Sequence, residues 1–166
     1  MSMIESEARR TAHPVDVVEQ MASLNHWSFD REAEDEISIS VTGGWTDYHV
    51  AFTWLPGLEA MHVGCAFDIK FNERRRAEIM HLVSLVNEQL WVGHFGLWEK
   101  ESVIIFRHAL LLAGGADPSR VQCEAVLQAA INACERYYQA FQFVIWAGRS
   151  AKDALEAALF ETAGEA

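Results

Sequence analysis

The sequence predicts an α+β protein built on a single antiparallel five-stranded sheet, in the order helix, three strands, helix, two strands, helix, with a short C-terminal helix added. Two patterns carry this prediction. Between residues 37 and 70, apolar and polar side chains alternate in three consecutive segments, which is the period of half-buried strands. In 72–90 and 117–147 the apolar residues recur at spacings of three and four, which is the period of a helix with one buried face.

Composition and charge fit one folded domain, 1–166, that is not suited to nucleic acid. Hydrophobic residues make up 51% of the 166 residues, and a chain of that length can bury roughly two-thirds of the surface that its unfolded form exposes. The 13 Lys and Arg against 24 Asp and Glu give a net charge of −11, which repels a phosphate backbone. We therefore expect no nucleic-acid partner.

The cysteines and the start of the chain both favour a cytoplasmic protein. Cys65, Cys123 and Cys134 are odd in number and match no zinc spacing. Cys123 and Cys134 would lie about 16 Å apart along one helix, too far to bond to each other. The chain does not start with an apolar segment of signal-peptide length, and no apolar run reaches the ~18 residues of a membrane span. We expect buried thiols in a reducing compartment and no membrane contact.

The first elements are a short helix and a charged connection. Residues 1–12 are polar and are expected to fray. Pro14 stands at the first turn of an amphipathic helix that ends near Asn25. The charged segment 30–36 is too polar to be covered, and we interpret it as an exposed connection.

Three strands then form a meander with one apolar face. Gly43-Gly44 is a hairpin signal, and Pro56-Gly57 supplies the next turn. The inward residues are Ile37, Ile39, Val41, Tyr48, Val50, Phe52, Trp54, Met61, Val63, Cys65, Phe67 and Ile69. The outward residues include His49, Ala51, Thr53, His62, Gly64 and Ala66. Helices on one side of such a sheet would leave the second face open.

The segment 72–90 is the central helix of the prediction, because it separates the two groups of strands. Its predicted buried residues are Ile79, Met80, Val83, Val86 and Leu90. We expect this helix to be the cover on which the sheet packs.

Two further strands, 93–99 and 102–112, follow the central helix. The second is apolar on both faces except at Arg107 and the histidine after it, as in a strand that is central in its sheet. A guanidinium on such a strand is costly unless it is paired. One interpretation is an ion pair with Glu124 or Glu135 on the next helix. The other is a docking group for an acidic partner or ligand.

The last helices complete the predicted domain. Asp117 is placed as the N-cap of a long helix that stops at Gly148. Ser150 resembles the start of a short final helix that ends near Phe160. Residues 162–166 are expected to fray.

The sequence shows no pattern of catalytic or metal-binding residues. His49 and His62 share the outer face of neighbouring strands. Pairing across the intervening turn places His49 opposite Cys65 or Ala66 instead, so the two imidazoles are not adjacent. The chain has no phosphate-binding glycine loop and no serine in a nucleophile elbow. We expect no metal, no cofactor and no enzyme activity.

The apolar residues left over indicate a surface that another molecule covers. The outer face of the sheet would carry Ala51, Gly64, Ala66, Gly96 and Trp98 rather than a run of charges. Large exposed apolar patches usually mark a site for a partner or a second copy. The alternative is that the last two helices fold over this face and hide it.

The order of elements resembles that of type III secretion chaperones and of the related YbjN-domain proteins. The likeness to the YbjN group rests on VNEQL at 86–90, GHF at 93–95 and VIIFRHAL at 103–110. These segments look like that family's helix end, its G-x-F strand and its apolar strand with an Arg, within a likeness that covers most of 13–147. The resemblance implies a non-enzymatic, dimeric domain that binds other polypeptides or acts as a regulator.

In the secretion chaperones the second helix commonly forms the dimer interface, which here implies 72–90. The helix after Gly148 departs from the family pattern, and it could cover the surface that a client would use.

Two functions follow from these expectations. The first is a chaperone-like or regulatory adaptor of the sensory transduction type, a homodimer that presents sheet and helix surfaces to a polypeptide client or regulatory partner by strand addition or groove docking. The second is a small-molecule sensor with a pocket between the sheet and the last helices and with Arg107 as its anchor. The expected partner or dimer surface comprises Met80, Val83, Trp91, Trp98, Arg107, Phe143 and Trp146.

Overall fold

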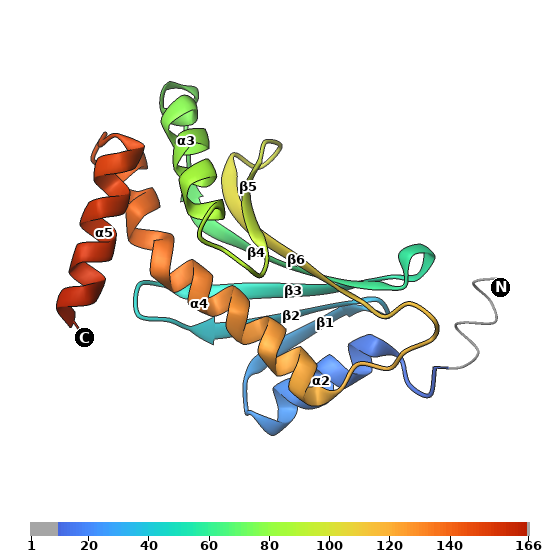
Figure 1. Cartoon of the computed structure of the whole chain (residues 1–166). Helices are drawn as coiled ribbons and strands as arrows, with labels where there is room; N and C mark the ends of the chain where they lie inside the picture. The colour runs from blue at the N-terminus through green and yellow to red at the C-terminus, as the bar shows by residue number, and fades with distance from the viewer. Residues whose placement is uncertain (1–9, 166) are drawn as a thin grey trace.

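The computed structural model describes residues 10–165, so residues 1–9 of the segment expected to fray, and Ala166, lie outside the described residues. Figure 1 shows the elements along the chain. They are α2 (Pro14–Leu24), β1 (Ser28–Ala33), β2 (Glu36–Thr42), β3 (Asp47–Leu55), β4 (Ala60–Lys70), α3 (Arg76–Asn87), β5 (His94–Trp98), β6 (Val103–Leu111), α4 (Arg120–Ile145) and α5 (Ala151–Glu165).

In the described residues, six antiparallel strands form one sheet in the order β1-β2-β3-β4-β6-β5. The α+β class and the single antiparallel sheet are confirmed, and the five expected strands are β2 to β6. Residues 30–36 are largely exposed, as predicted, but their assignment as a connection was wrong, because β1 includes 30–33 and pairs Asp30 with Ser38. An edge strand stays exposed, so it needs no apolar alternation, and charges on it oppose pairing with other chains.

The helices that lie on the sheet all cover the same face (Figure 1). α4 crosses β3, β4 and β6, α2 lies on β1 to β3, and α3 lies against β5. The main cover is therefore α4, and the prediction that the segment 72–90 plays this part was wrong. With 26 residues α4 is about 39 Å long and can cross the sheet, whereas the 12 residues of α3 reach only about 18 Å. No helix among the described residues is both long and apolar enough to span a bilayer.

The C-terminal helix α5 packs on α4 and α3 and not on the strands (Figure 1). Its backbone starts where predicted, because the Ser150 hydroxyl accepts a hydrogen bond from the Asp153 amide at 3.2 Å. The Ala151 amide also donates to the Glu78 carboxylate of α3 at 2.8 Å. The helix runs to Glu165, beyond its expected end.

The buried stripe of α3 differs from the predicted one. Ile79, Leu82 and Val86 are buried, whereas Met80 is 50% exposed. Val83 is half-buried against the core. The helix packs against α4 and α5 as well as β5, so its buried stripe is turned toward Leu82 and away from Met80.

The start of α4 also differs from the prediction. Ser119 is the N-cap, and its hydroxyl accepts from the Gln122 amide at 3.0 Å while the Gln122 side chain accepts from the Ser119 amide at 2.8 Å. Asp117 instead accepts a hydrogen bond from the Thr11 hydroxyl at 2.8 Å. The carboxylate expected to cap the helix therefore holds the N-terminal segment.

Arg10 anchors that segment to the body of the protein, although residues 1–12 were expected to fray. Its guanidinium donates to the Leu112 carbonyl at 2.8 Å and forms an ion pair with Glu59 at 3.1 Å. The same guanidinium lies 4.7 Å above the Trp54 ring. Because the Arg10 side chain is only 5% exposed, this contact fixes the chain where it enters the described structure.

Aromatic side chains form the centre of the core. The Phe95 ring lies 5.5 Å from the rings of both Phe106 and Phe141, between centroids. Gly93 approaches this cluster so closely, at a φ of +75°, that a Cβ atom there would lie 2.2 Å from the Phe106 ring. A glycine is therefore required where the chain enters β5.

The three cysteines are buried thiols, as predicted. Cys65 on β4 and Cys134 on α4 meet between the sheet and the helix. A hydrogen bond from one thiol to the other, together with burial, raises the pKa of Cys134.

We expect Phe95→Ala to lower the free energy of unfolding by about 3–5 kcal/mol, because it leaves a cavity among buried rings. Phe160→Ala is the matched control, since that ring is 80% exposed and its loss should cost less than about 0.5 kcal/mol. Urea unfolding followed by circular dichroism measures both. Similar losses for the two variants would contradict this packing.

Candidate functional site

The face of the sheet opposite the helices is hollowed and is left uncovered by the described residues. Residues of five strands line a groove of about 500 Å³ on this face, which runs over β2, β3, β4, β6 and β5. The lining residues are Ser38, His49, Ala51, Thr53, His62, Gly64, Ala66, Leu97, Trp98, Ile105 and Arg107. We call this surface the open face.

Small residues form the middle of the open face. Ala51 pairs with Gly64 across β3 and β4, and Ala66 pairs with Ile105 across β4 and β6. At the β5 edge of the same face, a Cβ atom added to Gly96 would meet nothing within 4 Å. Such a floor lets another backbone come close to the sheet. Of the two alternatives that the sequence left open, the structure shows the one in which α4 and α5 do not hide this face.

Charge is distributed unevenly across the open face. On the β1 side, Asp30 and Glu32 line an adjoining hollow that shares Ser38 and His49 with the groove. On the β6 side the ionisable lining residues are His62 and Arg107. The face is therefore acidic at the β1 edge and basic toward β6, with small and apolar residues between.

Arg107 lies on the open face and not against α4. Its Nε donates a hydrogen bond to Nε2 of His62 at 3.0 Å. The predicted ion pair with Glu124 or Glu135 was wrong, because Glu124 pairs with Arg120 and Glu135 accepts from a backbone amide of the β2–β3 turn. The alternation of β6 explains the difference, since Phe106 points to the core and its neighbour must point away.

Arg107 does not lie between the sheet and α4, where the sensor pocket was expected. Tyr137 and Phe141 of α4 are both 0% exposed and fill that layer with their rings. A ligand pocket anchored by Arg107 would have to lie on the open face.

His62 is held as a neutral imidazole by its surroundings. Partial burial is the main cause that lowers its pKa, and the charges of Arg107 and His94 lower it further. The hydrogen bond from Arg107 also stabilises the neutral imidazole, because Nε2 can accept a hydrogen bond only when it carries no proton. Protonating His62 would therefore break the bond and place two cations side by side.

The outer-face histidines are arranged as the sequence predicted. Thr53 is the strand partner of His62, and Val50 is the partner of Cys65, so His49 is not opposite His62. His49 instead shares a hydrogen bond of 2.9 Å with the Ser40 hydroxyl. In the part of the chain that the structure describes, no three His, Cys, Asp or Glu residues are grouped to hold a metal ion.

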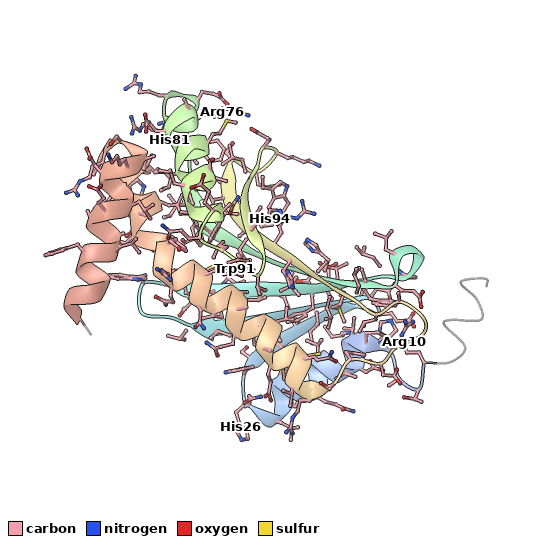
Figure 2. The ribbon with its side chains drawn as sticks, viewed as in Figure 1. Arg10, His26, Arg76, His81, Trp91 and His94 are labelled. Carbon is pink, nitrogen blue, oxygen red and sulfur yellow. The ribbon has the colours of Figure 1, made fainter. Side chains whose placement is uncertain are left out.

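The structure separates the predicted partner residues into several regions. Trp98 and Arg107 lie together on the open face. Met80 and Val83 are on α3, and Trp91 is on the loop before β5, where it is 100% exposed (Figure 2). Phe143 and Trp146 lie at the end of α4, where Arg149 stacks on the Phe143 ring at 4.5 Å.

Sequence reasoning missed the pairing of His62 with Arg107. Both residues were assigned correctly to strands, and His62 to the outer face, but their contact requires β6 to pair with β4 across the intervening α3 and β5. The unexplained guanidinium on an apolar strand was the one signal that pointed to this place.

We expect Arg107→Gln to raise the pKa of His62, because it removes one of the charges that disfavour the imidazolium. The pKa should stay below the ordinary 6.5, since burial remains. Nuclear magnetic resonance titration of the ring Cε1 proton measures it, and Arg120→Gln on α4 is the control.

The pKa of His62 also determines how this residue contributes to the stability of the fold at different pH. A folded-state pKa below 6.5 means that the contribution of His62 to stability is present above pH 6.5 and is lost as the pH falls through the folded-state pKa. An unchanged or lower His62 pKa in Arg107→Gln would contradict the contact.

Comparison with known proteins places this fold in a family. The model of the YbjN family, described as "Putative bacterial sensory transduction regulator", matches residues 14–143, from α2 to near the end of α4. No curated protein sequence matches the chain.

Two solved structures align with this chain. The crystal structure of YbjN from E. coli, described as a putative transcription regulator, aligns with 89% of this chain and 93% of its own, at 9% identity and a TM-score of 0.54. A chain of the crystal structure of the ExsC–ExsE complex aligns with 75% of this chain and 92% of its own, at 16% identity and a TM-score of 0.45. The family match spans most of the described sheet and helices, and the chain therefore belongs to the YbjN family.

Proposed function

We propose that this chain is a non-enzymatic cytoplasmic regulator that acts as a homodimer and binds a segment of another polypeptide on its open face. The family description supports the regulatory part. The buried, unpaired thiols support a reducing compartment. The observation that carries the proposal is the groove on the uncovered face of the sheet.

The chemistry of the groove suits a polypeptide segment. Its floor of alanine and glycine admits a backbone, while Trp98 and Ile105 offer apolar contact to side chains. Ser38 and Thr53 on the same face can hydrogen-bond to peptide groups. A nucleic acid fits less well, because the net charge of −11 repels phosphates.

The dimer contact belongs on a different surface. Met80 on α3 is 50% exposed, and Trp91 on the next loop is fully exposed. Neither lines the groove. Just before α3, Arg75 donates to the Val144 carbonyl at 2.9 Å, and on another side of α3 Glu78 accepts from the start of α5. Because α5 occupies that side, a second copy would contact the side of α3 that carries Met80.

Photocrosslinking tests the binding surface. A benzoylphenylalanine in place of Ala66, on the open face, should crosslink in the native cell to a discrete polypeptide, whereas one in place of the exposed Gln128 on α4 should not. The crosslinked polypeptide is then purified for binding by calorimetry.

We expect Ala66→Arg to raise its dissociation constant at least about tenfold, because the added side chain fills the groove. Gln128→Arg adds the same charge on the helical side and should leave affinity unchanged. Equal affinities for the two variants would show that the open face is not the binding surface.

Light scattering of the purified protein tests the dimer. We expect twice the mass of one chain, and a shift to the single-chain mass in Met80→Glu, because burying an unpaired carboxylate in the contact is costly. Gln128→Glu, at an exposed position of α4 away from this contact, adds the same charge and serves as the control. A wild-type protein that stays at the single-chain mass would refute this part of the proposal.

A further inference from the structure

Three imidazoles and one guanidinium gather where β5 stops pairing with β6. His94 on β5 is the strand partner of Arg107 and forms the last pair between these strands. Figure 2 labels His94 at this place. His62, Gly93, His94, Arg107, His108 and Ala109 line a second hollow of about 380 Å³ here. His62 and Arg107 also line the groove of the open face, so the two hollows are continuous.

This cluster has no carboxylate of its own. None of the residues that line either hollow is an Asp or a Glu, although acidic residues outnumber basic ones in the chain by 24 to 13. Among the described residues Arg107 forms no ion pair, and its side chain donates a hydrogen bond through Nε alone. The two terminal nitrogens of the guanidinium are therefore available as donors to a ligand.

We propose that this cluster is a carboxylate-binding subsite, which receives an Asp or Glu side chain of the polypeptide bound on the open face. Arg107 donates to the carboxylate through its terminal nitrogens, and His62 and His94 supply further N–H donors. The inference rests on the proposed function, and it adds the chemistry of the partner at one end of the groove.

The arrangement couples carboxylate binding to proton uptake. In the free protein, His62 accepts from Arg107 and stays neutral, and burial together with His94 also lowers the pKa of His108. A bound carboxylate offsets the repulsion between the cations, so His62 can take a proton and donate to it. Binding should therefore strengthen as the pH falls toward the pKa of His62.

The other charged groups around His62 do not oppose this coupling. On β3 its strand partner is Thr53, and His49 is the ionisable residue of that strand in the groove. On the β6 and β5 side the groups are Arg107 and His94. On β2, Glu36 is the strand partner of Thr53 and lies two strands from His62, while Asp30 and Glu32 belong to the β1 side. None of these carboxylates is among the groups that shift the pKa of His62.

The test uses a short synthetic peptide, Thr-Val-Glu-Val-Thr blocked at both ends, and its counterpart with Gln in place of Glu. The purified full-length protein is titrated with each peptide while the ring protons of His62, His94 and His108 are followed by nuclear magnetic resonance. We expect the Glu peptide to shift the His62 and His94 signals, to raise the pKa of His62, and to bind at least about tenfold more tightly than the Gln peptide. The preference should grow between about pH 7.5 and about pH 5.5.

Variants and a second anion complete the experiment. Arg107→Gln and His62→Gln should each remove the preference for Glu, whereas Arg120→Gln, on α4, should retain it. Equal binding of the two peptides, or no shift of the histidine signals, would overturn the proposal. Displacement of the Glu peptide by inorganic phosphate, at equal ionic strength, would also overturn the proposal, because the cluster would then be a general anion site.

The result is separable from that of the proposed function. If the protein binds the Glu and Gln peptides equally, while Ala66→Arg still weakens binding of the crosslinked partner, only the proposal of the carboxylate subsite is wrong. If Ala66→Arg has no effect either, the open face is not the binding surface and both proposals fail.

Discussion

The structure depends on one constraint, which is that the helices packed on the sheet all lie on the same face. α4 is long enough to cross the middle strands, and α2 and α3 cover the two ends. The inward side chains of every strand from β2 to β6 therefore enter one core, at whose centre the Phe95 ring meets Phe106 and Phe141. The same arrangement leaves the outward side chains without a covering layer, and strand alternation fixes which residues these are.

The sheet could be predicted because alternation is a local signal. The strands β2, β3 and β4 could be predicted because the polarity of each residue indicates which face of the sheet it occupies. The same holds for the strands on either side of Glu99. The edge strand β1 could not be found in this way, because an exposed edge imposes no apolar period on its sequence. The cover was assigned to the wrong helix for a related reason. Periodicity shows that a helix has a buried face, but it does not show which partner that face meets.

Arg107 shows most clearly what the sequence could not supply. Its presence on an apolar strand was a recognisable anomaly, and pairing with a carboxylate was a reasonable explanation for it. The register of β6 against β4 decides otherwise, since it places Arg107 on the outer face beside His62, and only the folded topology contains that register. An unpaired guanidinium in a strongly acidic protein is thus a feature of the open face. Together with the small floor at Gly64 and Ala66, it gives this face a basic group beside a surface that another backbone can approach.

The central claim is that the open face stays accessible in the protein as it exists in solution, and maleimide labelling of a single introduced cysteine tests it most directly. The three native thiols are buried, so Ala66→Cys and Gln128→Cys each report one site. The account expects the cysteine at position 66 to react readily at protein concentrations where the dimer forms, and to become protected when the partner polypeptide is added. Protection at position 66 in the purified protein alone, with position 128 still reactive, would show that the chain covers this face itself, and it would contradict the account.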